Sequence, residues 1–199
     1  KPPTPRRLDE LAQAKIRNYL HALLVAFAFY AYKSDPSLDF LNITLVSVSS
    51  MISAGVLYIW ALRLSFNADS GKSNIWQRIA SIVSDNTFIT LVLIIGGQST
   101  AGIWAIYIWT SIGYGVRYSV TYLHWNVFVS FSAFSIVCVT TPFWKQSHTF
   151  AIGMLIAMVI VPLYVGWLIR QLHNAVAERE SAYAAKSEFT ARMSHELRT

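Results

Sequence analysis

Long apolar stretches separated by short polar ones recur along this chain. A helix that crosses a membrane needs roughly 17–25 mostly apolar residues. The predicted spans are 16–32, 41–62, 79–97, 101–118, 122–141 and 149–169. Because the connections between them are short, the pattern predicts an all-α, polytopic membrane bundle of about six spans. It leaves no room for a separate ligand-binding domain between two spans.

Two of these predicted spans carry polar residues inside their apolar stretch. The first begins with Arg17, Asn18 and His21 in its opening turns and is the weakest span; we expect His21 to lie near the interface as a satisfied residue. The third contains the consecutive pair Asp85 and Asn86. Polar side chains inside a bilayer cost several kcal/mol and are functional candidates by default. Asp85 and Asn86 are therefore the clearest candidates for a ligand site or a switch.

Composition agrees with a lipid bilayer as the environment of the chain. Hydrophobic residues make up 54% and charged residues 13%, whereas a soluble domain carries about 25% charged residues. The single cysteine, Cys138, excludes an internal disulfide and a Cys-rich metal site, and we predict no metal. The net charge of +6 does not indicate nucleic acid, because the basic residues lie at the ends of apolar stretches.

The distribution of basic residues predicts the orientation. With six spans, one side of the membrane collects most of them, and the other side has only Lys33 and Lys145. The first group is Lys1, Arg6, Arg7, Lys15, Arg17, Arg63, Lys72, Arg78, Arg117 and Arg170. Since basic loops stay in the cytoplasm, we expect both termini to be cytoplasmic.

The last part of the chain changes composition after Arg170. Alanine and charged residues replace the apolar run, without Gly or Pro, and this predicts that the sixth span continues as one helix into a cytoplasmic signalling helix. Residues spaced by seven form a weak coiled-coil seam in which Arg and Lys occupy half of the positions; a solvated linker helix is the alternative. The expected divisions are 1–15 (cytoplasmic segment), 16–169 (transmembrane part), 170–188 (helix that follows the last span) and 189–199 (final segment).

The final residues, F-T-A-R-M-S-H-E-L-R-T over 189–199, resemble the phosphoacceptor box of sensor histidine kinases. The resemblance implies that His195 accepts a phosphoryl group. Phosphoryl transfer needs a neutral imidazole and a carboxylate that orients the ring and accepts a proton, and Glu196 supplies this carboxylate. Arg198 lies one turn on and could favour the incoming group. The box also implies a homodimer, and ATP with Mg²⁺ in the full-length protein.

Nothing in the chain resembles an ATP-binding domain. We therefore expect these residues to bind no cofactor and to be inactive alone. The absence of an initiating Met predicts that the natural chain begins earlier.

Several residues could bind a ligand or switch between states. An Asp85–Arg117 pair is geometrically possible, and it would either pin two helices or form a polar site for a ligand headgroup. Tyr118 follows Arg117, and Trp109 belongs to an aromatic group that anchors the helix or lines a slot for an acyl chain. Lys145, on the other side, is an equally good partner for a carboxylate.

The sixth predicted span contains a candidate hinge. Pro162, two residues before Tyr164, can kink the helix. The kink would either transmit a signal toward the end of the chain or form a static bend.

A more specific likeness involves 113–118 (G-Y-G-V-R-Y), 142–145 (P-F-W-K), 161–164 (V-P-L-Y) and Arg170. These segments resemble the landmarks of RpfC-type hybrid sensor kinases, over roughly 85–199. That family recognises diffusible signal factors, which are cis-2-unsaturated fatty acids of bacterial quorum sensing. The resemblance implies a hydrophobic signal, a kinase domain and downstream receiver and phosphotransfer domains.

The leading hypothesis is thus a sensor for a hydrophobic signal coupled to a histidine kinase. One alternative is a kinase that senses another small hydrophobic molecule, such as an α-hydroxyketone. Another is a ligand-independent membrane module that anchors the kinase or senses a partner. A transporter is disfavoured, because no internal repeat is present and the spans lead directly into a kinase box.

Overall fold

The computed structural model describes residues 5–35, 37–66 and 75–196; the side chains of 5–13, 64–66, 188, 189, 191, 192 and 194–196 are not described. Within these residues every element is helical, which confirms the all-α class. The elements are α1 (Pro5–Ser34), α2 (Phe40–Phe66), α3 (Ile75–Gly96), the 3₁₀ helix η1 (Gly97–Trp104), α4 (Ala105–Arg117), α5 (Val120–Thr140), α6 (Pro142–Gln146) and α7 (His148–Glu196).

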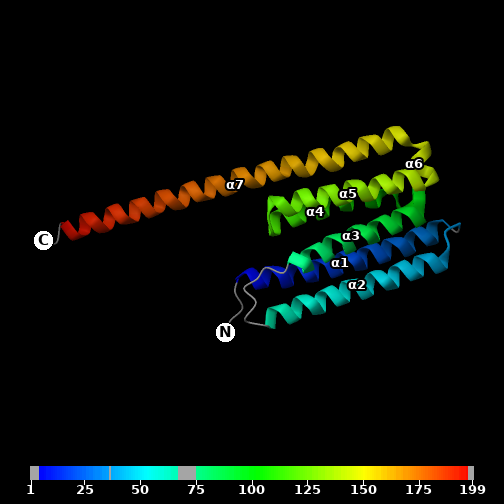
Figure 1. Cartoon of the computed structure of the whole chain (residues 1–199), viewed down its shortest axis with the longest axis horizontal. Helices are drawn as coiled ribbons and strands as arrows, with labels where there is room; N and C mark the ends of the chain where they lie inside the picture. Colours follow the sequence, from blue (N-terminus) through cyan, green and yellow to red (C-terminus); the bar gives the residue numbers. More distant parts are fainter. Residues whose placement is uncertain (1–4, 36, 67–74, 197–199) are drawn as a thin grey trace.

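The helices α1 to α5 lie side by side, and α7 covers one side of this bundle (Figure 1). The neighbours with the most extensive contacts are α1 with α2, α4 with α5, and α5 with α7. One end of the bundle gathers the start of α1, the end of α2, the start of α3 and the end of α4. Arg63, Arg78 and Arg117 belong to that end, which we call the basic end. The short α6 lies at the opposite end (Figure 1).

A reversal at Gly97 folds α3 back against α4. Gly97 has a φ of 50°, the left-handed region that favours glycine. Two hydrogen bonds join α3 to α4. Thr90 bonds Tyr107 at 2.7 Å, and farther from the turn Asp85 accepts from Tyr114 at 2.9 Å. Because the earlier residue of α3 pairs with the later residue of α4, the two helices form an antiparallel hairpin.

Four segments of the described residues are long and apolar enough to cross a membrane: Phe40–Arg63, Ile75–Arg117, Val120–Thr140 and His148–Ser187. The predicted count of about six spans is not confirmed. The helix α1 is not among the four, since polar and charged residues fill its first half. The third and fourth predicted spans fall together in Ile75–Arg117, which includes the hairpin at Gly97.

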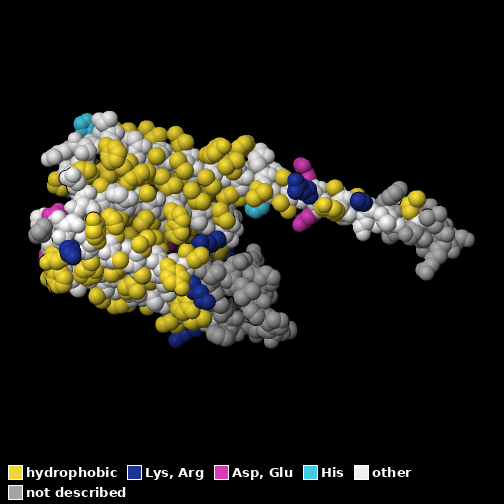
Figure 2. Space-filling view, turned by 180° about the vertical axis from the view of Figure 1, so that it is seen from behind, with side chains coloured by type: hydrophobic (Ala, Val, Ile, Leu, Met, Phe, Trp, Pro, Cys, Tyr) yellow, Lys and Arg dark blue, Asp and Glu magenta, His cyan; other side chains and the backbone are white. Residues whose placement is uncertain are grey.

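The exterior of the bundle is largely apolar (Figure 2). Large hydrophobic side chains lie exposed on α2, α5 and α7, for example Ile52, Phe128 and Ile156. An apolar surface that extends over several helices is typical of a protein that contacts lipid. The sides of the bundle therefore carry few charged side chains compared with its two ends (Figure 2).

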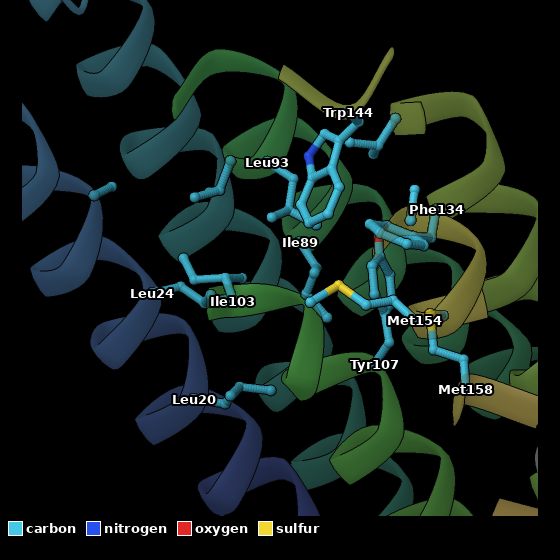
Figure 3. Close-up of a cluster of buried hydrophobic side chains, with 14 of the residues drawn as sticks. Leu20, Leu24, Ile89, Leu93, Ile103, Tyr107, Phe134, Trp144, Met154 and Met158 are labelled. Carbon is cyan, nitrogen blue, oxygen red and sulfur yellow. The ribbon is translucent and has the colours of Figure 1, made fainter. Parts of the chain in front are cut away.

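Aromatic residues fill the interior near α6. Trp144 is 1% exposed, and its ring meets Phe134 edge-on at 5.1 Å between centroids. Tyr107 and Leu93, both fully buried, pack in the same cluster (Figure 3). The short helix α6 thus places Trp144 in the core, and apolar side chains pack closely at this end of the bundle.

The helix α7 is one continuous element of 49 residues, which is roughly 70 Å long at 1.5 Å per residue. Its first half packs on α4 and α5. From Gln171 to Ser187 all side chains are exposed, and this part extends away from the bundle (Figure 1). The helix therefore runs unbroken through 170, where the sequence predicts a boundary between sensor and signal helix; that division stays a prediction.

Candidate functional site

A carboxylate lies at the centre of the bundle, bound by residues of other helices. Asp85 of α3 is 5% exposed. Its Oδ1 lies 3.2 Å from Nε2 of His21 on α1, and its Oδ2 accepts a hydrogen bond from the Tyr114 hydroxyl of α4 at 2.9 Å. His21 Nδ1 in turn lies 2.6 Å from Oγ of Ser50 on α2. This carboxylate cluster (His21, Ser50, Asp85 and Tyr114) joins four helices.

The chemistry of the groups assigns the protons. An ionised carboxylate can only accept, so Nε2 of His21 carries the proton that points at Asp85. In the neutral ring Nδ1 is then an acceptor, and the Ser50 hydroxyl donates to it. In each of the three contacts of the cluster a donor thus faces an acceptor, as buried polar groups require.

A second cluster follows directly along α3. Asn86 donates from Nδ2 to Oδ1 of Asn126 on α5 at 2.8 Å, and its own Oδ1 accepts from Ser130 at 2.7 Å. Asn126 donates to Oγ of Ser111 on α4 at 2.8 Å. This amide cluster ties α3, α4 and α5 together. Because Asp85 and Asn86 are adjacent on the buried face of α3, the two clusters form one polar layer across the bundle.

Arg17 lies one helical turn before His21 on α1 and is 5% exposed. Its Nη1 donates to Oγ of Ser81 at 2.6 Å. Its Nε and Nη2 are buried without a hydrogen-bond partner among the side chains that the structure describes. A guanidinium carries five N–H donors, so Arg17 retains unused donors inside the protein.

The Asp85–Arg117 pair that the sequence makes geometrically possible does not form between these two described residues. Asp85 is instead paired with His21, whose Nε2 lies 3.2 Å from Oδ1. Arg117 is half-buried and lines the same cavity as Asp85, Arg17 and Trp109. The two residues are therefore brought together as predicted, but the carboxylate is already bound by His21 and Tyr114.

The other predicted site residues lie apart from this layer or at its edge. Tyr118 stacks on Tyr114 with 6.0 Å between ring centroids, and the guanidinium of Arg78 lies 4.1 Å from the Tyr118 ring centroid. Lys145 is exposed on α6 at the opposite end of the bundle. Tyr164 is exposed on α7 and stacks on Trp167 at 5.9 Å. The structure thus does not bring Lys145 or Tyr164 to the polar layer.

Close packing connects the polar layer to α7. Gly115, next to Tyr114, is so close to α5 that an added Cβ would lie 2.6 Å from Leu123 Cδ1. Leu123 is fully buried, and the same Cδ1 atom also lies next to Gly166 of α7, where an added Cβ would be 3.5 Å from it. Pro162 is buried one turn before Gly166. A shift of α4 would therefore press on α7 through Leu123.

The chain is similar to a known sensory protein. It is 29% identical over 192 residues, or 96% of its length, to the sensory/regulatory protein RpfC of Xanthomonas campestris pv. campestris, in two strains. It spans 26%, about a quarter, of the length of these relatives. The chain is related to RpfC-type sensor kinases. No protein-family model matches it, and no solved structure matches it.

The RpfC match reaches further than the sequence landmarks. These landmarks lie within roughly 85–199, whereas the match covers 96% of the chain and so includes most of α1 and α2. The polar partners that α1 and α2 supply, His21 and Ser50, therefore belong to the related region. Relation to a sensory protein and the apolar helices together place the chain in a membrane-bound signalling protein, which indicates the inner membrane.

Sequence reasoning missed Arg17 and Asn126 as site residues and assigned His21 to the interface. His21 is in fact fully buried. The signal that could have found them was present, since each is a polar residue in a stretch that is otherwise apolar. What was missing is the rotation of each helix, because the sequence does not tell whether a polar side chain faces lipid or the interior.

The phosphoacceptor box lies at the far end of α7. The backbone of His195 and Glu196 belongs to its last turn, while their side chains, and all of Arg198, lie outside the described residues. From Arg170 the helix runs about 26 residues to His195, or roughly 40 Å. No group of His, Cys, Asp or Glu that could hold a metal ion occurs in the described part of the chain.

Proposed function

We propose that this chain is the membrane sensor region of a bacterial two-component histidine kinase of the RpfC type. It detects a hydrophobic signal of the cis-2-unsaturated fatty acid class and controls autophosphorylation of His195. The full-length protein is an ATP-dependent, homodimeric hybrid kinase with a receiver domain downstream. Both termini of this chain lie in the cytoplasm.

The observation that carries the proposal is the continuity of α7. One helix contacts the bundle at Gly166 and ends at the box of His195. Displacement at one end of a rigid helix reaches the other without an intervening joint. The relation to a protein described as sensory and regulatory supports a signalling output for this movement.

The polar layer supports two states of the bundle. A ligand shifts an equilibrium only by its differential affinity for the states, so the bundle needs an element with discrete arrangements. A hydrogen-bonded layer supplies such an element, because a buried donor or acceptor that leaves one partner needs another, so its rearrangements are discrete. The tight contact of Gly115 with Leu123 then conveys a shift of α4 to α7.

At the output end the reaction is phosphoryl transfer from ATP with Mg²⁺. A nitrogen of the His195 ring forms a bond to the γ-phosphorus, and the bond from this phosphorus to the bridging oxygen breaks, so that ADP leaves. Glu196 orients the ring and accepts its proton. The catalytic domain that binds ATP lies elsewhere in the full-length protein, so this region alone has no kinase activity.

The test is autophosphorylation of the full-length kinase in nanodiscs with labelled ATP. We expect a cis-2-enoic acid to change the rate, and an α-hydroxyketone and the solvent to leave it unchanged. His195→Ala abolishes labelling. His173→Ala is the matched control, because His173 is an exposed histidine of the same helix outside the box.

Each outcome decides between the functions. A response to the hydroxyketone alone replaces the signal class but keeps the sensor. No response to any amphiphile, with normal basal labelling, favours a ligand-independent membrane module. Labelling that persists in His195→Ala contradicts the assignment of the phosphoacceptor.

A further inference from the structure

A cavity at the basic end of the bundle lies between α1, α3 and α4. It encloses about 300 Å³, part of it open to the surroundings. Its walls include Arg17 and Leu20 of α1, Asp85 of α3, and Trp109 and Arg117 of α4. The carboxylate cluster thus forms one wall, and the two arginines form others.

The charges of this cavity do not balance. Arg17 and Arg117 contribute two positive charges, and Asp85 contributes one negative charge. Both oxygens of Asp85 are already bound, to His21 and to Tyr114. Among the described side chains that line it, the cavity is therefore electropositive, and none of them offers the arginines a free anionic acceptor.

Arg17 is the residue that points to a ligand. It is 5% exposed, and its Nε and Nη2 have no acceptor among the described side chains. Leaving a buried donor unsatisfied costs about 1–3 kcal/mol, and more for a charged group. A planar guanidinium presents adjacent N–H groups in a fork that matches a carboxylate or a phosphate. An anion in the cavity would satisfy the atoms that the fold leaves without acceptors.

We propose that this cavity binds the anionic headgroup of an amphiphile, with Arg17 as the primary contact and Arg117 as the second. The inference rests on the proposed function for its biological meaning, because a fatty acid signal would place its carboxylate here. The same chemistry also fits the phosphate of an anionic lipid.

The surroundings favour an amphiphile over a soluble anion. Trp109 lines the cavity and is 49% exposed, and the exterior of the bundle is largely apolar (Figure 2). About 20 Å³ of it admits the centre of a water-sized atom, which is room for a small polar group only. The charged oxygens of a headgroup therefore lie inside, and the attached chain lies along the outside beside Trp109. The cavity adjoins Tyr114, so occupancy acts directly on the α3–α4 contact.

This site differs from the partners that the sequence offered for a carboxylate. Lys33 and Lys145 lie at the opposite end of the bundle, and both are exposed. An exposed lysine keeps its hydration and gains little from a ligand, whereas a buried arginine with unused donors gains much. The structure therefore assigns the headgroup to the basic end.

The test is direct binding to the full-length protein in phosphatidylcholine nanodiscs, so that kinase output is not needed. Three probes are titrated: a cis-2-dodecenoic acid, its uncharged methyl ester, and phosphatidylglycerol built into the disc. Native mass spectrometry counts the bound molecules. The variants are Arg17→Gln, Arg117→Gln and, as the matched control, Arg63→Gln, which removes an exposed positive charge at the same end.

We expect the acid or phosphatidylglycerol to bind at least tenfold more tightly than the ester. Arg17→Gln should weaken this binding by about 10- to 100-fold, as for the loss of a hydrogen bond to a charged group. Arg117→Gln should have a smaller effect, and Arg63→Gln should leave the affinity unchanged. The wild-type comparison of acid with ester stands even where Arg17→Gln fails to fold.

Equal binding of acid and ester, with no preference for phosphatidylglycerol, overturns the inference. So does undiminished binding to a folded Arg17→Gln protein. Arg17-dependent binding of phosphatidylglycerol alone supports the site and identifies a membrane lipid as its occupant, while the proposed fatty acid signal fails. Arg17-dependent binding of the acid without any change in kinase rate supports the site and contradicts the proposed function.

Discussion

Replacing Asp85 by Asn tests whether the carboxylate cluster holds the bundle together. The substitution keeps the size of the side chain and removes its charge. Asp85 accepts from both His21 and Tyr114, whereas an amide has one accepting oxygen and a donating nitrogen. One of the two contacts is therefore lost, and the amide N–H₂ meets a donor in its place.

The magnitude follows from measured hydrogen bonds inside membrane proteins, which are worth on average ~0.6 kcal/mol and at most ~1.7 kcal/mol. Two such bonds give about 1–3 kcal/mol for the whole carboxylate. We expect Asp85→Asn to lower the free energy of unfolding by ~1–2 kcal/mol. Tyr114→Phe, which deletes one donor at constant shape, should cost ~1 kcal/mol.

The assay is a double-mutant cycle, measured by reversible unfolding of the full-length protein in mixed micelles. If Asp85 and Tyr114 bond each other, the double variant is less destabilised than the sum of the single ones, with a coupling of ~0.6–1.7 kcal/mol. Thr87→Val is the matched control. Thr87 is exposed on the same helix, and its hydroxyl donates to the backbone carbonyl of Val83 one turn earlier. Coupling within error of zero in folded variants would refute the contact and the cluster built on it.

Three further predictions concern other parts of the chain. Gly115→Ala should cost about 1–3 kcal/mol through overpacking and should be relieved by Leu123→Ala, whereas Gly55→Ala, with no atom within 4 Å of the added Cβ, should be neutral in the same unfolding assay. Serine hydroxyls that donate to Asp35, and a backbone N–H, lower its pKa below the usual 3.8. The stabilisation is therefore present above the unfolded pKa and lost as the pH falls through the folded one, so the melting temperatures of wild type and Asp35→Asn should converge in strong acid. Pro162→Ala restores a backbone N–H inside α7 and should weaken the response of the kinase rate to the signal if Pro162 acts as a hinge; an unchanged response would make it a static bend.

Much of the fold could be predicted from the order of apolar stretches. The helices α2, α3 and α5 begin and end within a few residues of the predicted spans, because a run of about 20 apolar residues has few alternatives to a buried helix. The limits of α1 were less predictable. It is helical from Pro5 to Ser34, well before the predicted start at 16, since helix formation continues through polar residues that end an apolar run.

The candidate site was predicted in part. Asp85 and Asn86 stood out because each is polar within an apolar stretch, and both lie in the buried polar layer. For Asp85 the sequence made Arg117 a geometrically possible partner, because both residues are predicted near the same interface. In the structure Asp85 is hydrogen-bonded to His21 and Tyr114 instead, because the polar face of α1 points into the bundle.

The sequence by itself determined the class of the molecule: a helical membrane protein with a basic end, and a histidine box carried on its last helix. These properties depend on the number and order of residue types, which a single chain displays. The tertiary structure alone decided which polar residues face one another, since that depends on the rotation of each helix and on the reversal at Gly97. The buried Arg17, with donors left unused, is a consequence of that rotation, because the same residue on the outer face of α1 would be one more basic side chain at a membrane surface.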